Sequence, residues 1–144
     1  MSKYEKKALS FYEQGYNCAQ AVLAAAAEDV GITTEQALRI ASSFGGGMGG
    51  IKGGPCGALT ALLMVEGLRD GYAEARLGQT LREMKAAQAK RTRQLAASFE
   101  EQCGALSCRE LLTLIGKDEA WKKQPRPCSV FVACAARMLE EDKE

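Results

Sequence analysis

The stretch SFGGGMGGIKGGPCGA, residues 43–58, holds eight of the fifteen glycines in the 144-residue chain. Glycine weakens regular structure, but it permits positive φ angles and close approach of the backbone to a neighbouring group. The run leads into Pro55-Cys56. A cysteine that follows proline stands where a helix begins and free backbone N–H groups point outward. We therefore expect this stretch to wrap closely around the Cys56 thiol, a neighbouring helix or a bound group.

The composition indicates a single helical domain over residues 1–144. The chain is 47% hydrophobic, rich in alanine and poor in runs of β-branched residues, which favours helices over sheet. Its length is sufficient for a hydrophobic core without disulfides or metals. The net charge of +1 gives no electrostatic reason to expect binding to nucleic acid or to an anionic membrane. No segment reads as a signal peptide or a membrane span, so we expect a cytoplasmic protein.

Six cysteines and the absence of histidine restrict the chemistry. Without histidine, the chain has no Ser-His-Asp triad, no Cys-His pair and no mixed Cys/His zinc site. In a reducing compartment, a surplus of cysteines more often serves metal or redox chemistry than a framework of disulfides. No two cysteines have the CxxC spacing that is typical of thioredoxin-like dithiols and zinc knuckles.

The hydrophobic pattern predicts an all-α helical bundle of six or seven helices, with the glycine-rich stretch as a loop before a central buried helix. The expected helices cover residues 2–14, 18–30, 34–43, 56–71, 72–102, 108–116 and the chain from residue 128 onward. We expect a break at Gly15, one continuous first helix being the alternative. The helix from Cys56 is apolar on most faces and should be the central one. Residues 72–102 should form one long exposed helix, whose narrow Leu/Met stripe is compatible with a homodimer.

Four of the six cysteines fall at the predicted beginnings of helices, each after an N-cap residue or a proline. They are Cys18, Cys56, Cys108 and Cys128. A helix N-terminus carries partial positive charge and unpaired N–H donors, so it lowers the pKa of a thiol and favours the thiolate. If the four N-termini converge, they create one sulfur site to which the glycine-rich loop donates backbone N–H groups. Cys103 and Cys134 lie inside or at the end of helices, and we expect them to be ordinary packed residues.

At these residues the chain resembles the C_GCAxxG_C_C family, a family of redox-active proteins named for its cysteine pattern. The resemblance rests on GYNCAQAV at 15–22, FGGGMG at 44–49, CGA at 56–58, CREL at 108–111, and Cys128 before the last helix. It extends over nearly the whole chain and places the recurring cysteines of the family on the same four positions. One departure is Ala61, where the family motif has glycine. The resemblance implies a redox or electron-transfer role.

Three functions are consistent with these observations. In the first, Cys56 is the reactive thiolate of a thiol–disulfide or electron-transfer protein, and Cys18, Cys108 or Cys128 resolves it as a disulfide. In the second, all four sulfurs ligate one metal ion or iron–sulfur cluster. In the third, the cysteines are passive and the chain is a helical binding module. The loop glycines expected around the site are Gly45, Gly46, Gly47, Gly49 and Gly57. The expected redox partner is a protein or a small molecule, and the only cofactor considered is a cysteine-bound metal or cluster.

Overall fold

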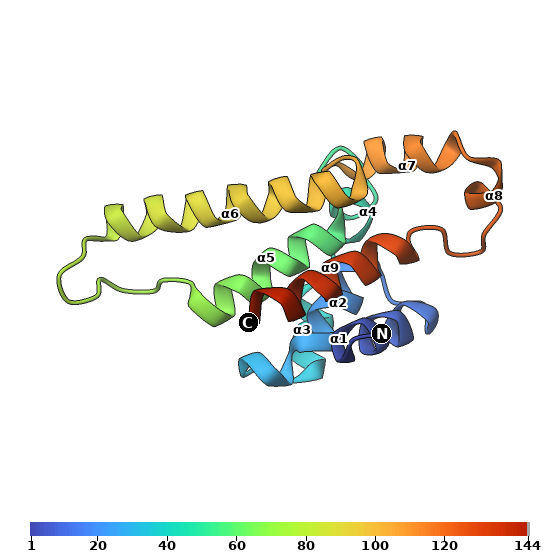
Figure 1. The fold of residues 1–144 in the computed structure, drawn as a ribbon. Coiled ribbons are helices and arrows are strands. Elements are labelled where there is room, and N and C mark those ends of the chain that lie inside the picture. Colours follow the sequence, from blue (N-terminus) through green and yellow to red (C-terminus); the bar gives the residue numbers. More distant parts are fainter. Residues whose placement is uncertain (144) are drawn as a thin grey trace.

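The computed structural model describes residues 1–143, and these residues have an all-α fold (Figure 1). The helical elements are α1 (Lys3–Glu13), α2 (Cys18–Ala26), the 3-10 turn η1 (Glu28–Val30), α3 (Thr34–Ile40), α4 (Gly45–Met48), α5 (Gly57–Asp70), α6 (Leu81–Cys103), α7 (Cys108–Gly116), α8 (Glu119–Lys122) and α9 (Ser129–Lys143). Within the described residues there is no strand, and Pro55 and Ser107 form an isolated β-bridge. None of the described helices has the length and apolarity that a membrane-spanning segment requires. The predicted all-α fold class is confirmed.

Side-chain caps set the beginnings of the helices that carry cysteines. At α2, Asn17 and Gln20 form a capping box with reciprocal hydrogen bonds of 2.8 and 3.0 Å. At α7, the Ser107 hydroxyl accepts a hydrogen bond of 3.1 Å from the N–H of Glu110. These caps satisfy backbone donors that have no partner inside the helix. The predicted break between α1 and α2 is also present, at Gly15, which has a φ of 109°.

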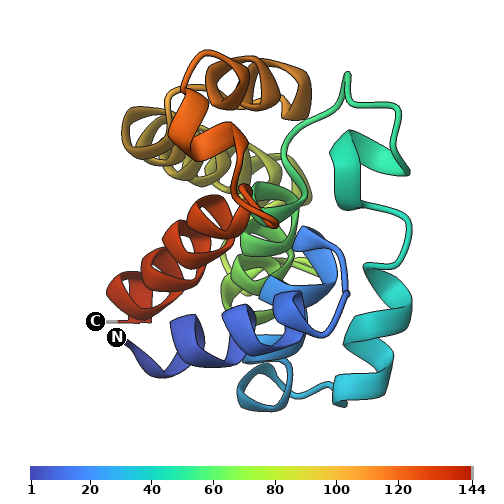
Figure 2. The same cartoon turned by 90° about the vertical axis from the view of Figure 1, so that its right-hand side faces the viewer.

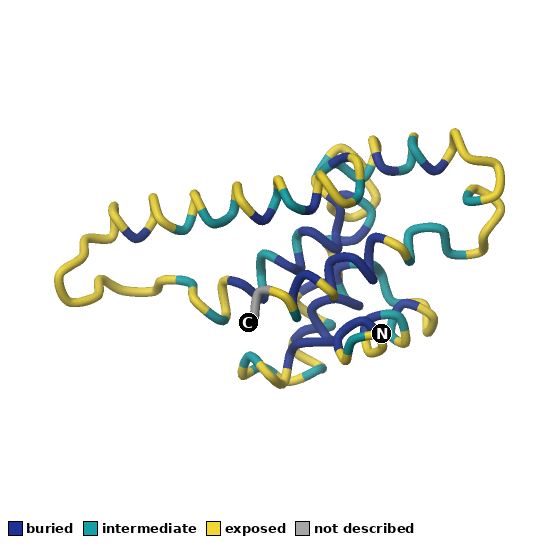
Figure 3. The backbone as a smooth tube through the Cα atoms, in the orientation of Figure 1, coloured by how far each residue is buried: buried dark blue, intermediate teal, exposed yellow. Residues whose placement is uncertain are grey.

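The hydrophobic core lies mainly between α1, α2, α5 and α9, and α2 is its most completely buried helix. Ala19 and every residue from Ala21 to Ala26 are buried. These mostly small side chains let α1, α5 and α9 pack around α2 (Figure 3). From the sequence we expect the helix after Cys56 to be the central buried helix. That helix, α5, does bury Leu59 and Val65, but its last turn is largely exposed.

The segment expected to be one helix over residues 72–102 is only partly helical. Residues 71–80 form an irregular link, and α6 follows it. Thr80 and Glu83 form a capping box at the start of α6, and Gly78 has a φ of 84°, which ordinary helical residues do not adopt. Figure 1 shows the first part of α6 projecting away from the other helices. The buried residues of α6 are Met84, Leu95 and Phe99. The predicted length was therefore wrong, because the Thr80 cap fixes a later start.

The glycine-rich stretch contains a single turn, α4, whose backbone is left-handed. Gly46, Gly47 and Gly49 have φ angles of 65°, 64° and 61°, and Met48 between them has a φ of 74°. This conformation costs roughly 1–2 kcal/mol for a residue that carries a Cβ atom, and nothing comparable for glycine. A run of glycines is therefore the economical way to build such a turn.

The chain between α4 and α5 pairs with the residues that precede α7. The N–H of Cys56 donates to the carbonyl of Leu106 at 2.8 Å, and the N–H of Cys108 donates to the carbonyl of Gly54 at 3.0 Å. Figure 2 shows α3, α4 and this segment following one another along one side of the molecule. Because these backbone bonds link the two segments, they hold the first residues of α5 and α7 beside each other.

Gly46 and Gly47 provide a matched test of how tightly this turn is packed. A Cβ atom on Gly47 would lie 2.7 Å from Cα of Lys52 and 2.8 Å from Cβ of Cys108, whereas one on Gly46 would meet nothing within 4 Å. We expect Gly46→Ala to lower the free energy of unfolding by about 1–2 kcal/mol. Gly47→Ala should lower it by about 2–5 kcal/mol, because overpacking adds to the backbone strain. Urea unfolding followed by circular dichroism measures both losses, and equal losses would show that the packing is looser than described.

Candidate functional site

One cavity, with a volume of about 350 Å³, is lined by all four cysteines that the sequence analysis selects. Cys18 is the first residue of α2 and Cys108 is the first residue of α7. Cys56 is the N-cap residue of α5, and Cys128 directly precedes α9. The structure therefore places the beginnings of four helices around a single cavity.

The sulfur of Cys18 lies between the N-termini of two helices. The Cys56 thiol donates a hydrogen bond to it, and this bond has the largest effect on its ionisation. The backbone N–H groups of Gly46, Ala19 and Ala58 donate further hydrogen bonds. Ala19 belongs to the first turn of α2 and Ala58 to that of α5, so the partial positive charge of both helix N-termini favours a negative sulfur. Together these donors outweigh burial and lower the pKa of Cys18 to about 6, which makes it a thiolate at neutral pH.

The same hydrogen bond keeps Cys56 protonated. The bond to Cys18 raises the pKa of Cys56, and both burial and the negative charge of Cys18 raise it further. Cys56 is only 5% exposed. From the sequence we expect Cys56 to be the reactive thiolate, but the lowered pKa of Cys18 and the raised pKa of Cys56 place the negative charge on Cys18. Three backbone N–H groups, those of Gly46, Ala19 and Ala58, donate to Cys18, whereas two, those of Ala58 and Leu59, donate to Cys56.

Gly57 provides the space that the Cys18 sulfur needs at the start of α5. A Cβ atom at this position would lie 2.5 Å from Sγ of Cys18 and 2.9 Å from the carbonyl oxygen of Phe44. Sulfur and carbon do not approach to 2.5 Å without a bond, so any side chain here would displace the thiolate or the helix. Glycine at this position is thus a requirement of space.

The other loop glycines named by the sequence analysis differ in their distance from the site. Gly46 lines the cavity, Gly47 packs against Cβ of Cys108, and Gly45 packs against the N-cap side chain of α2. Gly49 does not line the cavity, and the nearest atom to its Cβ direction is the carbonyl oxygen of Ser43. The turn therefore serves the site through its first three glycines.

Cys108 and Cys128 line the cavity as neutral thiols. Burial raises the pKa of both, and the negative charge of Cys18 raises it further. For Cys128 the resulting pKa is about 11. At neutral pH, the cavity therefore contains one thiolate and three protonated thiols.

The walls of the cavity that are not cysteine consist of Tyr12, Gly15, Tyr16, Asn17, Gly46, Lys52, Leu111, Leu112, Arg126 and Phe131. Of these, only Gly46 was named as a site residue from the sequence. The guanidinium carbon of Arg126 lies 3.7 Å from the centre of the Tyr12 ring, and the guanidinium donates to the carbonyl of Tyr16 at 3.1 Å. The sequence offered one signal for this arginine: it stands between Pro125 and Pro127, which restrict the backbone immediately before Cys128.

The four sulfurs do not form a single metal-binding group as they lie in this structure. Among the described residues, no three or more cysteine, aspartate or glutamate side chains are placed to hold one metal ion. A four-cysteine zinc or iron–sulfur site needs all four sulfurs within bonding distance of one centre. The arrangement is that of a hydrogen-bonded pair, Cys18 and Cys56, with two further thiols lining the same cavity.

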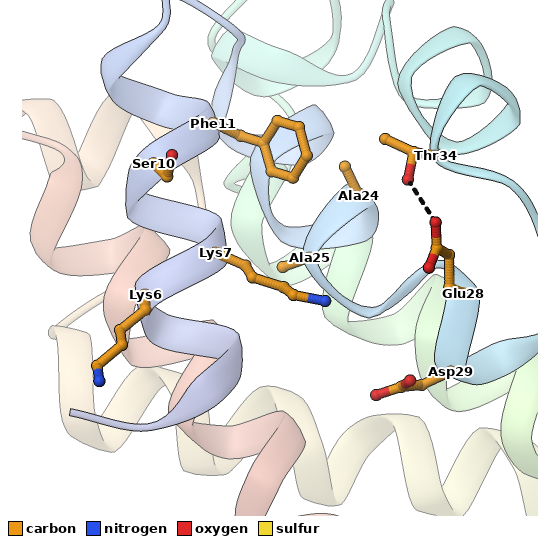
Figure 4. A pocket seen from close by; sticks show the side chains of 9 residues that line it. All are labelled: Lys6, Lys7, Ser10, Phe11, Ala24, Ala25, Glu28, Asp29 and Thr34. Atoms are coloured by element: carbon orange, nitrogen blue, oxygen red, sulfur yellow. Dashed lines mark hydrogen bonds between the residues drawn. The ribbon is translucent and has the colours of Figure 1, made fainter.

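A second cavity, of about 370 Å³, contains no cysteine (Figure 4). It is bounded by α1, α2, η1 and the start of α3, and its charged residues are Lys6, Lys7, Glu28 and Asp29. The Thr34 hydroxyl donates to Glu28 at 3.5 Å. Lys7 extends toward the side of Glu28 and Asp29 (Figure 4), and without a sulfur this cavity lacks the nucleophile that the first one has.

A protein-family model with the description "Putative redox-active protein (C_GCAxxG_C_C)" matches residues 16–142. Because the match covers most of the chain, this protein belongs to the C_GCAxxG_C_C family. Searches of curated proteins and of solved structures gave no match. The family description names redox activity, which agrees with a site built from thiols.

Replacing Cys56 isolates the hydrogen bond that most favours the Cys18 thiolate. In Cys56→Ala this donor is lost, so the pKa of Cys18 should rise from about 6 toward the ordinary thiol value of about 8.5. Cys56→Ser keeps an O–H donor at the same position and should leave the pKa close to that of the original protein. The rate of iodoacetamide alkylation at Cys18, followed by mass spectrometry from about pH 5 to about pH 9, gives each midpoint. An unchanged midpoint in Cys56→Ala would mean that this hydrogen bond does not control the ionisation.

Proposed function

We propose that this protein is a thiol-dependent redox protein that reduces a disulfide of a partner protein or small molecule, with Cys18 as nucleophile and Cys56 as resolving cysteine. The observation that carries the proposal is the asymmetric pair in the cavity. A thiolate at Cys18 accepts a hydrogen bond from a neutral thiol at Cys56. Such a pair has both sulfurs that an exchange reaction needs, and it distinguishes their roles.

In the first step, the Cys18 thiolate attacks one sulfur of the substrate disulfide. A new S–S bond forms between Cys18 and that sulfur, the substrate S–S bond breaks, and the other substrate sulfur leaves as a thiolate. A thiol with a pKa of about 6 is mostly ionised at neutral pH. Its nucleophilicity is somewhat reduced by the low pKa, but its large thiolate fraction compensates.

In the second step, Cys56 becomes the nucleophile because Cys18 has lost its charge. Two of the three influences that raise the pKa of Cys56, the hydrogen bond to Cys18 and the charge of Cys18, depend on the Cys18 thiolate. Once Cys18 is in the mixed disulfide, Cys56 can give its proton to the departing thiolate and attack the Cys18 sulfur. The products are a Cys18–Cys56 disulfide, one substrate thiol and the thiolate released in the first step, which takes a proton from water, so two electrons pass from the protein to the substrate. A dithiol donor restores the reduced pair by the reverse exchange.

Cys108 and Cys128 have a different part in this scheme. Both keep their protons at neutral pH, because burial and the charge of Cys18 raise their pKa values. Neither therefore competes with Cys18 for the first attack. Their thiols line the space next to the mixed disulfide, together with the apolar side chains of Leu111 and Phe131.

Reaction with oxidised glutathione tests the roles of Cys18 and Cys56. Trypsin separates the two cysteines, because cleavage after Lys7, Arg39, Lys52 and Arg69 places them in peptides 8–39 and 53–69. We expect these peptides to become linked in the original protein and in the Cys128→Ser control. In Cys56→Ala, which lacks the resolving thiol, glutathione should remain attached to Cys18.

Three results would contradict the proposal. Glutathione attached first to Cys56, Cys108 or Cys128 would assign the nucleophile to another position. Stoichiometric iron or zinc in protein purified without oxygen would favour the four-cysteine metal site. Uniformly slow alkylation of all six thiols would favour a binding module with passive cysteines.

A further inference from the structure

The two cysteines outside the cavity form a pair of their own. Cys103 is the last residue of α6, and Cys134 lies within α9. From the sequence we expect both to be ordinary packed residues, and the two thiols are hydrogen-bonded to each other. Cys134 is 3% exposed, whereas Cys103 is partly exposed. Neither of them lines the cavity that holds the other four.

We propose that Cys103 and Cys134 are a second dithiol, which a low-molecular-weight disulfide oxidises to a disulfide that joins α6 to α9. Cys103 is the more accessible sulfur and forms the mixed disulfide, with release of one small thiol. Cys134 then attacks the Cys103 sulfur and releases the second small thiol. The two protein thiols thus give two electrons to the S–S bond of the reagent and their two protons to its sulfurs.

The position of the Cys134 side chain is fixed against the last turn of α6. Its Sγ lies 3.5 Å from Oε1 of Gln102, to which the protonated thiol donates. The amide nitrogen of Gln102 donates in turn to Oγ of Ser98 at 3.1 Å, which leaves the amide oxygen directed at Cys134. Cys103 is the next residue of α6, and the hydrogen bond between the two thiols places its sulfur at the same contact between α6 and α9.

The surroundings of the two thiols assign them different roles. Cys103 lies at the C-terminal end of α6, where the helix dipole disfavours negative charge. Cys134 lies one helical turn before Arg137. The hydrogen bond from Cys103 is the main influence that lowers the pKa of Cys134 to about 7, and the Arg137 guanidinium adds to it. The same hydrogen bond raises the pKa of Cys103. The hydrogen bond from Cys103 is lost once Cys103 is in the mixed disulfide, but the Arg137 guanidinium still favours the Cys134 thiolate that resolves it.

A disulfide here would close a loop, residues 103–134, that contains two of the four cavity cysteines, Cys108 and Cys128. In the middle of this loop, α8 is mostly exposed, and the only buried residues of α7 are Leu111 and Ile115 (Figure 3). A crosslink across the ends of such a segment restricts the unfolded chain and so favours the folded arrangement. Oxidation of the second pair would thus hold Cys108 and Cys128 in place without consuming either thiol.

Peptide mapping of the full chain after incubation with oxidised glutathione tests this inference. Free thiols are blocked at low pH, and the protein is digested with trypsin and chymotrypsin. Cleavage after Leu106 separates Cys103 from Cys108, and cleavage after Phe131 separates Cys128 from Cys134. We expect a peptide pair joined through Cys103 and Cys134, and a rise of roughly 10 °C in the melting temperature on oxidation. In the Cys103→Ser variant, which cannot form this disulfide, the same treatment should not produce this rise of roughly 10 °C.

The order of attack is tested with Cys134→Ala, in which glutathione should stay on Cys103. Glutathione that also remains on Cys103 in the original protein would overturn the inference, and so would a link between Cys103 and Cys108. Folded protein in which both Cys103 and Cys134 stay unmodified would overturn it as well. The Cys18–Cys56 link is read from other peptides, so failure of one pair is distinguished from failure of the other.

Discussion

The hydrogen bonds to the Cys18 sulfur are the interaction on which the site depends. A buried negative charge is costly unless it is paired or hydrogen-bonded. The donors to this sulfur come from α2, from the glycine turn and from α5, and the largest contribution comes from the Cys56 thiol. Since the four donors belong to three separate segments, the thiolate is stable only when these segments are packed together. Gly57 leaves the space for the Cys18 sulfur. The residues that pack these segments together are therefore also the residues that control the ionisation of Cys18.

The two cysteine pairs have a common electrostatic design. In each pair one thiol donates a hydrogen bond to the other, and the acceptor has the lower pKa: Cys18 of about 6 and Cys134 of about 7. Helix N-termini favour the Cys18 thiolate, whereas Arg137 assists Cys134. The proposed roles nevertheless differ between the pairs. In the first pair the sulfur with the lower pKa, Cys18, attacks first. In the second pair the more exposed Cys103 reacts first, and the buried Cys134 with the lower pKa resolves the mixed disulfide.

Local signals in the sequence were sufficient for the fold class and for the choice of the four cavity cysteines. Capping residues such as Asn17 and Ser107 determine where helices begin, and these positions are visible without any tertiary contact. The sequence also contains a signal for the start of α6, the capping box of Thr80 and Glu83. We did not use this signal, because the absence of proline from residues 72–102 favoured one continuous helix. The polarity of Cys18 and Cys56 and the contact between Cys103 and Cys134 depend on how distant segments pack. Spacing along the chain carries no information about such contacts.

The most direct test is a pH titration of protein labelled with ¹³C at the cysteine β-carbons, whose chemical shifts change when the thiol ionises. The Cys18 signal is identified by its absence in Cys18→Ser. The account predicts a Cys18 midpoint close to pH 6, with Cys56 still protonated at the pH where an ordinary thiol ionises, about 8.5. A Cys18 midpoint at or above that ordinary value, with Cys56 ionising first, would contradict it.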